Sequence, residues 1–185
     1  MRTRSLMLFS LLVAAALAAC GSSAAPTGPA TGSAPDGWLT YTDTTDGFLF
    51  AYPPEGQITT GPGGSARIDL PVSPHTTLVE KFLEVNAAVD AYPCPSPTFT
   101  VRSEGDQLTV GELTFLEQTV GGVATGNIYE GTAYSAQHGA ACASLTFMLH
   151  STDPGSYVNP PAVFDRAAET AVFTTILSTF RWTSP

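Results

Sequence analysis

The leader of the chain, residues 1–19, determines which part of it folds and in which compartment. Arg2 and Arg4 give a positive start, residues 6–17 form an apolar run, and small residues follow. This layout is typical of a secretory signal, because the apolar run is too short to span a membrane comfortably. We therefore expect residues 1–19 to be removed and the remaining chain to fold outside the cytoplasm.

Composition divides the remaining residues into a linker and one domain. Residues 21–36 hold small residues, prolines and a single charge, so they have nothing to bury and should form a flexible tether with a span of roughly 22 Å. The whole chain is 43% hydrophobic and only 12% charged, the reverse of a disordered protein. The predicted organisation is a linker over residues 20–36 and a single globular domain over residues 37–185.

The acidic charge balance excludes one class of partner. The chain carries 16 acidic and seven basic residues, and two of the basic ones, Arg2 and Arg4, leave with the leader. An acidic surface repels phosphates, so we expect no binding to nucleic acid. The same surface repels anionic lipid headgroups, so membrane attachment by a basic patch is not expected either.

The cysteines suggest one disulfide. Cys20 lies directly after the leader, and the remaining pair, Cys94 and Cys142, belongs to an exported domain in which an even pair indicates a bridge. Closing that loop would stabilise the domain by roughly 4 kcal/mol. The alternative is a reactive thiol assisted by His138 or His150.

Alternating apolar residues predict a series of short strands. Residues 38–43 and 48–52 flank a turn, Asp43 to Gly47, and should form a hairpin that Pro53 and Pro54 end. Further strands are expected over residues 57–60, 66–70, 78–91, 113–120, 127–136 and 142–150. We expect Gly121 and Gly122 to end the strand that precedes them.

The fold class follows from one strand and one helix. Residues 145–149 are apolar at both parities, which predicts a central strand covered on both faces. A helix is expected to begin with Asn159 as N-cap and Pro160 at its first position, and its apolar stripe runs to Phe180. The predicted class is therefore α+β, an antiparallel sheet with a long C-terminal helix packed on it in an α/β/α sandwich.

Two resemblances add to these expectations. The end of the leader, Leu17-Ala18-Ala19-Cys20, resembles the bacterial lipobox, which implies lipidation of Cys20 and attachment to the extracytoplasmic side of a cell membrane. The motif Tyr41-x-Asp43-x-x-x-Gly47-Phe48-x-Phe50-x-Tyr52-Pro53, with the closing Ile176-Leu177-Ser178-Thr179-Phe180, resembles PsbP-like domains. That resemblance implies an α/β/α fold and a non-enzymatic binding, assembly or accessory role.

Catalytic and metal-binding patterns are weak. No Gly-x-Ser-x-Gly elbow and no close zinc-ligand spacing occur in the sequence. Asp43 and Asp46 are weak candidates for calcium, and the segment that holds them does not match an EF-hand loop. A hydrolase would need two opposed carboxylates, for which Glu112, Glu117 and Glu130 are available on neighbouring predicted strands. We expect no cofactor and no metal.

The aromatic residues are the candidate contact surface. Tyrosine and tryptophan bury large area at low entropic cost, and the set comprises Trp38, Tyr41, Tyr52, Tyr92, Tyr129 and Tyr134. The expected function is a membrane-anchored, extracytoplasmic module that contacts a protein of the cell envelope. A small-ligand-binding lipoprotein and a hydrolase with a pair of glutamates are the alternatives.

Overall fold

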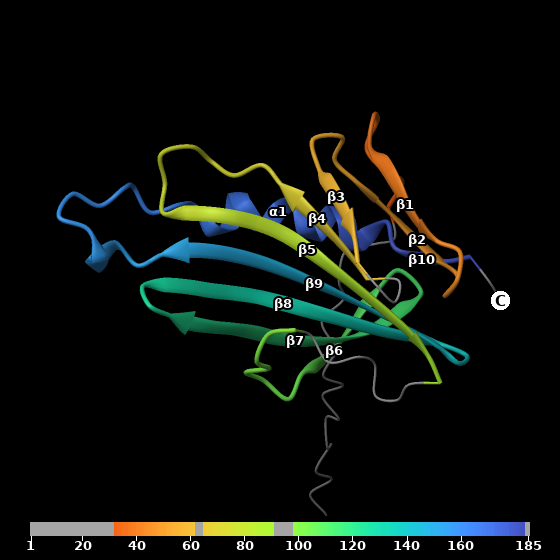
Figure 1. Ribbon diagram of the computed structural model, residues 1–185. Coiled ribbons are helices and arrows are strands. Elements are labelled where there is room, and N and C mark those ends of the chain that lie inside the picture. The colour runs from red at the N-terminus through yellow and green to blue at the C-terminus, as the bar shows by residue number, and fades with distance from the viewer. Residues whose placement is uncertain (1–31, 62–64, 91–97, 184–185) are drawn as a thin grey trace, which may run out of the picture.

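The computed structural model describes residues 32–61, 65–90 and 98–183 (Figure 1). The leader and Cys20 lie outside these residues. The strands of the described part are β1 (Leu39–Asp43), β2 (Phe48–Tyr52), β3 (Gln57–Thr60), β4 (Ala66–Leu70), β5 (Leu78–Val89), β6 (Asp106–Val110), β7 (Leu113–Ala124), β8 (Asn127–His138), β9 (Ala141–Thr152) and β10 (Arg181–Trp182). Its helices are the short 3-10 turn η2 (Pro154–Ser156) and α1 (Arg166–Ser178).

The strands form two antiparallel sheets. The larger has seven strands in the order β3-β4-β5-β9-β8-β7-β6, and the smaller has the order β1-β2-β10. β9 lies at the centre of the larger sheet, as the apolar residues at both of its parities predicted. The hairpin β1–β2 is also confirmed. Asp43 Oδ1 accepts the backbone N–H groups of Thr45 and Asp46, both at 2.9 Å, and Gly47 takes a positive φ of 72°.

One face of the larger sheet carries the main core. Side chains of β5 and β9, such as Leu83, Leu145 and Phe147, pack there against Phe173, Ile176 and Leu177 of α1. Phe48 and Phe50 of the small sheet join the same core, and Phe180 stacks on Phe48 with ring centroids 5.5 Å apart. Figure 1 shows α1 and the small sheet on the same side of the seven-stranded sheet. We call this side the covered face.

The opposite face has a smaller cluster and no described helix. Phe82, Val120, Ala133 and Met148 are buried there, and Phe99 packs over them from the segment that follows residue 97. Arg67 lies over the Phe82 ring, with its guanidinium carbon 3.6 Å from the ring centroid. A loop aromatic and a cation thus lie on this face, where the predicted α/β/α sandwich would have a helical layer.

The predicted fold class, an α+β sandwich with a long C-terminal helix, is wrong. The domain is mostly β, with two antiparallel sheets and only one α-helix in its described part. Residues 181–182, at the end of the apolar stripe, pair with β2 at Leu49 and Phe48. The end of the chain therefore completes a second sheet, which the sequence pattern had not revealed.

The helix also begins later than predicted. Asp165 is the N-cap in place of Asn159, and its Oδ1 accepts the backbone N–H of Ala168 at 3.2 Å. The preceding segment, with Pro160 and Pro161, is extended because the Ala162 carbonyl accepts the backbone N–H of Thr77 at 2.8 Å. This tertiary pairing is absent from local sequence signals and delays the helix.

Candidate functional site

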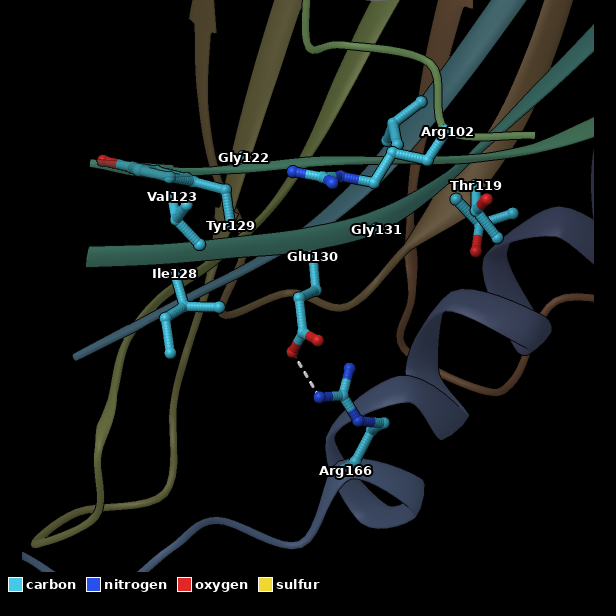
Figure 2. A pocket seen from close by; sticks show the side chains of 11 residues that line it. Arg102, Thr119, Gly122, Val123, Ile128, Tyr129, Glu130, Gly131 and Arg166 are labelled. Carbon is cyan, nitrogen blue, oxygen red and sulfur yellow. Dashed lines mark hydrogen bonds and ion pairs between the residues drawn. The ribbon is translucent and has the colours of Figure 1, made fainter. Parts of the chain in front are cut away.

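A hollow of about 530 Å³ lies at one end of the sheet, beside the β7–β8 hairpin (Figure 2). Cross-strand pairs place Thr119 opposite Thr132 and Val123 opposite Ile128 on the covered face, and Arg166 at the start of α1 forms another wall. The hairpin extends beyond the first turn of the helix. The hollow therefore lies where the hairpin extends past the start of α1, and Val120 and Tyr129 of the opposite face also line it.

Glycines shape this end of the sheet. Gly121 and Gly122 were expected to end the strand, but β7 continues through them and pairs with Glu130 and Tyr129 of β8. A Cβ at Gly121 would collide with the Tyr129 carbonyl oxygen, whereas a Cβ at Gly122 would meet nothing within 4 Å. Gly121 thus permits a close backbone approach, and Gly122 leaves the rim of the hollow open.

The hollow gathers positive charge in an acidic protein. Of the five basic residues that follow the leader, Arg102 and Arg166 both line it. Arg166 forms an exposed ion pair with Glu130, and Figure 2 shows these two side chains pointing toward each other from α1 and β8. Among the described residues the Arg102 guanidinium has neither an ion pair nor a hydrogen bond. The site therefore contains two cations and one carboxylate.

A histidine network lies on the other side of β8. His150 Nδ1 lies 2.9 Å from Glu80 Oε2, and its Nε2 lies 2.8 Å from Asn127 Oδ1. Tyr129, which also lines the hollow, stacks on the His150 ring at a centroid distance of 4.3 Å and on the Phe99 ring at 5.7 Å. These two ring contacts hold the Tyr129 side chain in the wall of the hollow.

The carboxylates are not arranged for glycoside hydrolysis. Glu117 lies opposite Tyr134, whereas Glu130 lies opposite Gly121, four residues away along β8. At the rise of a strand this separates them by roughly 13 Å, beyond the spacing of either hydrolase geometry. Glu112 lies in the turn between β6 and β7. Glu117 instead accepts a hydrogen bond from the Tyr134 hydroxyl at 3.1 Å, and burial together with the Glu117 charge raises the pKa of Tyr134.

The predicted aromatic contact residues do not share one surface. Trp38, Tyr41 and Tyr134 are partly buried against the main core, and Tyr52 is buried within it. Burial, with the nearby Asp43 and Asp46, also raises the pKa of Tyr41. Tyr129 lies on the opposite face of the sheet, and Tyr92 lies outside the described residues. Of the described members, Tyr129 lines the hollow.

The weak calcium candidates have a structural role. Asp43 is buried and caps the β1–β2 turn, and burial followed by the charge of Asp43 raises the pKa of Asp46. Within residues 32–61, 65–90 and 98–183, no group of three or more His, Cys, Asp or Glu side chains is placed to hold a metal ion.

The predicted disulfide stays a prediction. Cys142 is fully buried in β9, opposite Ala88, and Cys94 lies outside the described residues. The lipidation residue Cys20 lies outside them as well. No helix in the described part of the chain is both long and apolar enough to cross a membrane.

A buried ion pair fixes the start of α1 beside the hollow. Lys81 of β5 and Glu169 of α1 are 9% and 4% exposed, and Lys81 Nζ lies 2.6 Å from Glu169 Oε2. The Ser73 backbone N–H and hydroxyl both donate to Glu169 Oε1, the former at 3.1 Å. Burial acts to raise the pKa of Glu169, but the hydrogen bonds and charge of Lys81, with Ser73, outweigh it, so the pKa is lowered.

Sequence reasoning named Tyr129 and Glu130 but missed the two arginines of the hollow. Arg102 and Arg166 are 64 positions apart and carry no local motif, so only the fold brings them together. One signal was available: β-branched and small residues continue the strand pattern through Gly121 and Gly122, up to Val123 and Ala124. Following that pattern would have extended the hairpin to its observed length.

Comparisons with known proteins show similarity at the level of fold. No protein-family model matches the chain, and comparison with curated proteins finds no match. A crystal structure of a protein from Bacteroides thetaiotaomicron VPI-5482 is similar with a TM-score of 0.52 and 10% identity, covering 78% of this chain and 48% of that one. This chain thus spans about half the length of that protein, and the likeness shows a shared fold alone.

A second solved structure is the cyanobacterial PsbP (CyanoP) from Synechocystis sp. PCC 6803. It matches with a TM-score of 0.45 and 13% identity, covering 82% of this chain and 98% of that one.

Proposed function

We propose that the protein is a lipid-anchored, extracytoplasmic binding module of the PsbP-like type that acts by contacting another protein and not by catalysis. The leader and Cys20 support the location, since both match an exported, lipidated chain. The resemblance of the two chain ends to PsbP-like domains supports an accessory role.

One observation carries the proposal: the end hollow combines a cation, Arg102, that has no ion-pair partner in the described part of the chain with an exposed apolar residue, Val123. Val123 is 75% exposed although it lies in a strand. An uncovered apolar side chain beside an unpaired charge is typical of a surface that meets a partner. The single carboxylate, Glu130, offers no second group for acid–base chemistry.

A small-ligand site is the second candidate, favoured by the size of the hollow. Its volume of about 530 Å³ lies within the range of small-molecule pockets. The Gly122 side is open, however, whereas a solute-binding pocket encloses most of its ligand. The open shape favours a protein segment over a solute.

Site-specific photo-crosslinking in the producing cells tests the proposal. A photoreactive residue replaces Val123 at the hollow. The matched control is Val89, an exposed valine at the end of β5 that lies away from the hollow. We expect a discrete crosslinked protein from position 123 and none from position 89. The same products from both positions, or none from either, would contradict a specific binding role.

A further inference from the structure

The outer edge of β7 is unpaired beside the hollow. β6 pairs with β7 as far as Glu117, and the segment around Val101 then continues the edge. The Arg102 backbone N–H donates to the Thr119 carbonyl at 2.8 Å, and the Gly121 N–H donates to the Thr100 carbonyl at 3.0 Å. No described segment pairs with β7 beyond Gly121.

Strand geometry defines which groups are free at that edge. The backbone groups of Thr119 and Gly121 point outward, and alternate residues of an antiparallel strand point the same way. The N–H and C=O of Val123 therefore face outward too, with no backbone partner in the described part of the chain. Exposed strand edges of this kind accept an added strand from another chain.

Arg102 lies where a side chain of an added strand would arrive. The Arg102 Nε is 3.5 Å from the position that a Cβ on Gly121 would take, so its guanidinium group lies over Gly121. Gly121 is the last residue of β7 that pairs with a described segment on this edge. The second cation, Arg166, has exposed Glu130 as its ion-pair partner among the described residues, and an exposed pair of this kind contributes little to stability. A carboxylate is the group that this excess of guanidinium charge fits.

A smaller cavity of about 80 Å³ adjoins the hollow and shares Glu130 and Thr132 with it. It lies between β8, β9 and α1, with Phe173 and Leu149 among its apolar walls. In strand addition the backbone hydrogen bonds give affinity, and pockets for the side chains of the added strand give specificity. Here Arg102 and the apolar niche offer two such places.

We propose that the occupant of the hollow is an extended acidic segment of a partner protein, which adds a short strand to β7 at Val123 and places a carboxylate on Arg102. This inference rests on the proposed function, because it names how the same site would bind its protein partner. Charge complementarity selects the segment: the surrounding chain is acidic, and the hollow is a locally basic part of it.

Peptide titration of the ¹⁵N-labelled mature protein in detergent micelles tests the inference. The probe is a capped valine–threonine–aspartate–threonine–valine peptide, compared with its lysine-for-aspartate counterpart and with an N-methylated form that cannot pair as a strand. We expect saturable amide shifts at Val123 and Arg102 with the aspartate peptide, about tenfold weaker binding of the lysine peptide, and none of the N-methylated one.

Variants locate the effect. R102Q should weaken binding of the aspartate peptide about tenfold and leave binding of the lysine peptide unchanged. R181Q, which removes a cation on β10, should change the affinity for neither peptide. V123P removes the outward N–H at an edge position that tolerates proline. It should abolish the shifts, and if it unfolds, the N-methylated peptide tests the reciprocal hydrogen bond, from the peptide N–H to the Val123 carbonyl.

Other outcomes overturn the inference. Equal binding of the aspartate and lysine peptides, or no saturable shift in the millimolar range, would exclude an acidic strand. Acetate or inorganic phosphate that reproduces the full set of shifts would indicate a simple anion site, and unlabelled protein that reproduces it would make the occupant a second copy. A partner crosslinked from position 123 without peptide binding would leave the proposed function intact and refute strand addition alone.

Discussion

The buried pair of Lys81 and Glu169 offers the sharpest test of the energetics. Removing one partner leaves an uncompensated charge in a site where both residues are less than one-tenth exposed. Breaking a buried pair in this way costs about 3–5 kcal/mol. For a domain of this size we expect Tm to fall by roughly 6–20 °C in Lys81→Met or Glu169→Gln.

The double variant K81M/E169M separates the pair from its surroundings. Replacing both charges by apolar groups of similar volume is often neutral, so it should recover most of the stability that each single variant loses. Urea denaturation of the four proteins gives the coupling free energy. Arg166→Gln, which breaks the exposed pair with Glu130 and a distant contact with the Phe164 ring, is the matched control and should cost less than about 1 kcal/mol.

Acid titration checks the same pair independently. Because the folded-state pKa of Glu169 is lowered, its contribution is complete above the ordinary glutamate pKa of about 4.3 and is lost as pH falls through the folded-state pKa. The stability difference between the wild type and E169Q should therefore shrink on acidification. In K81M, burial acts without the opposing charge, and the pKa of Glu169 should rise.

Two results would refute this reasoning. Single variants that unfold within about 0.5 kcal/mol of the wild type would show that the pair contributes nothing measurable. A double variant whose loss equals the sum of the single losses would show that the two charges do not interact.

The remaining predictions concern the strand glycines and the cysteines. Gly131→Ala should destabilise the domain by about 1–3 kcal/mol in denaturant melts, because a Cβ there collides with the β9 backbone and a methionine sulfur. Gly122→Ala is the control and should melt like the wild type, because a Cβ there meets no atom within 4 Å. Equal effects of the two substitutions would contradict the packing. Cys20→Ala should release the protein from membranes on fractionation, and retention in the membrane fraction would disprove the anchor. Reduction of a bridge between Cys94 and Cys142 should lower Tm, with a loss of roughly 4 kcal/mol in the free energy of unfolding. Free thiols at these residues in the native protein would exclude the bridge.

The sequence predicted the elements whose structure depends on neighbouring residues. The β1–β2 hairpin follows from Asp43, which accepts two backbone N–H groups of its own turn, and from Gly47, which supplies the positive φ. The central place of β9 follows from its apolar residues on both faces. In these elements the residues that form the structure are neighbours in sequence.

Long-range pairing explains what was missed. Ala162 is held extended by Thr77, far away in the chain, so the prolines before α1 mark an extended approach and not a helix start. β10 exists because Arg181 and Trp182 find β2. The hollow likewise needs Arg102 and Arg166, which lie in separate elements, and no sequence motif indicates that the fold places them close together.

The hydrogen bond from the Gly32 N–H to the Ser178 carbonyl, at 3.0 Å, has a consequence for orientation. It brings the incoming chain to the carboxyl-terminal pole of α1, while Arg166 marks the other pole, about 20 Å away along a 13-residue helix. In a protein anchored at Cys20, the linker would therefore enter the fold at one end of α1 and the hollow would lie at the other end.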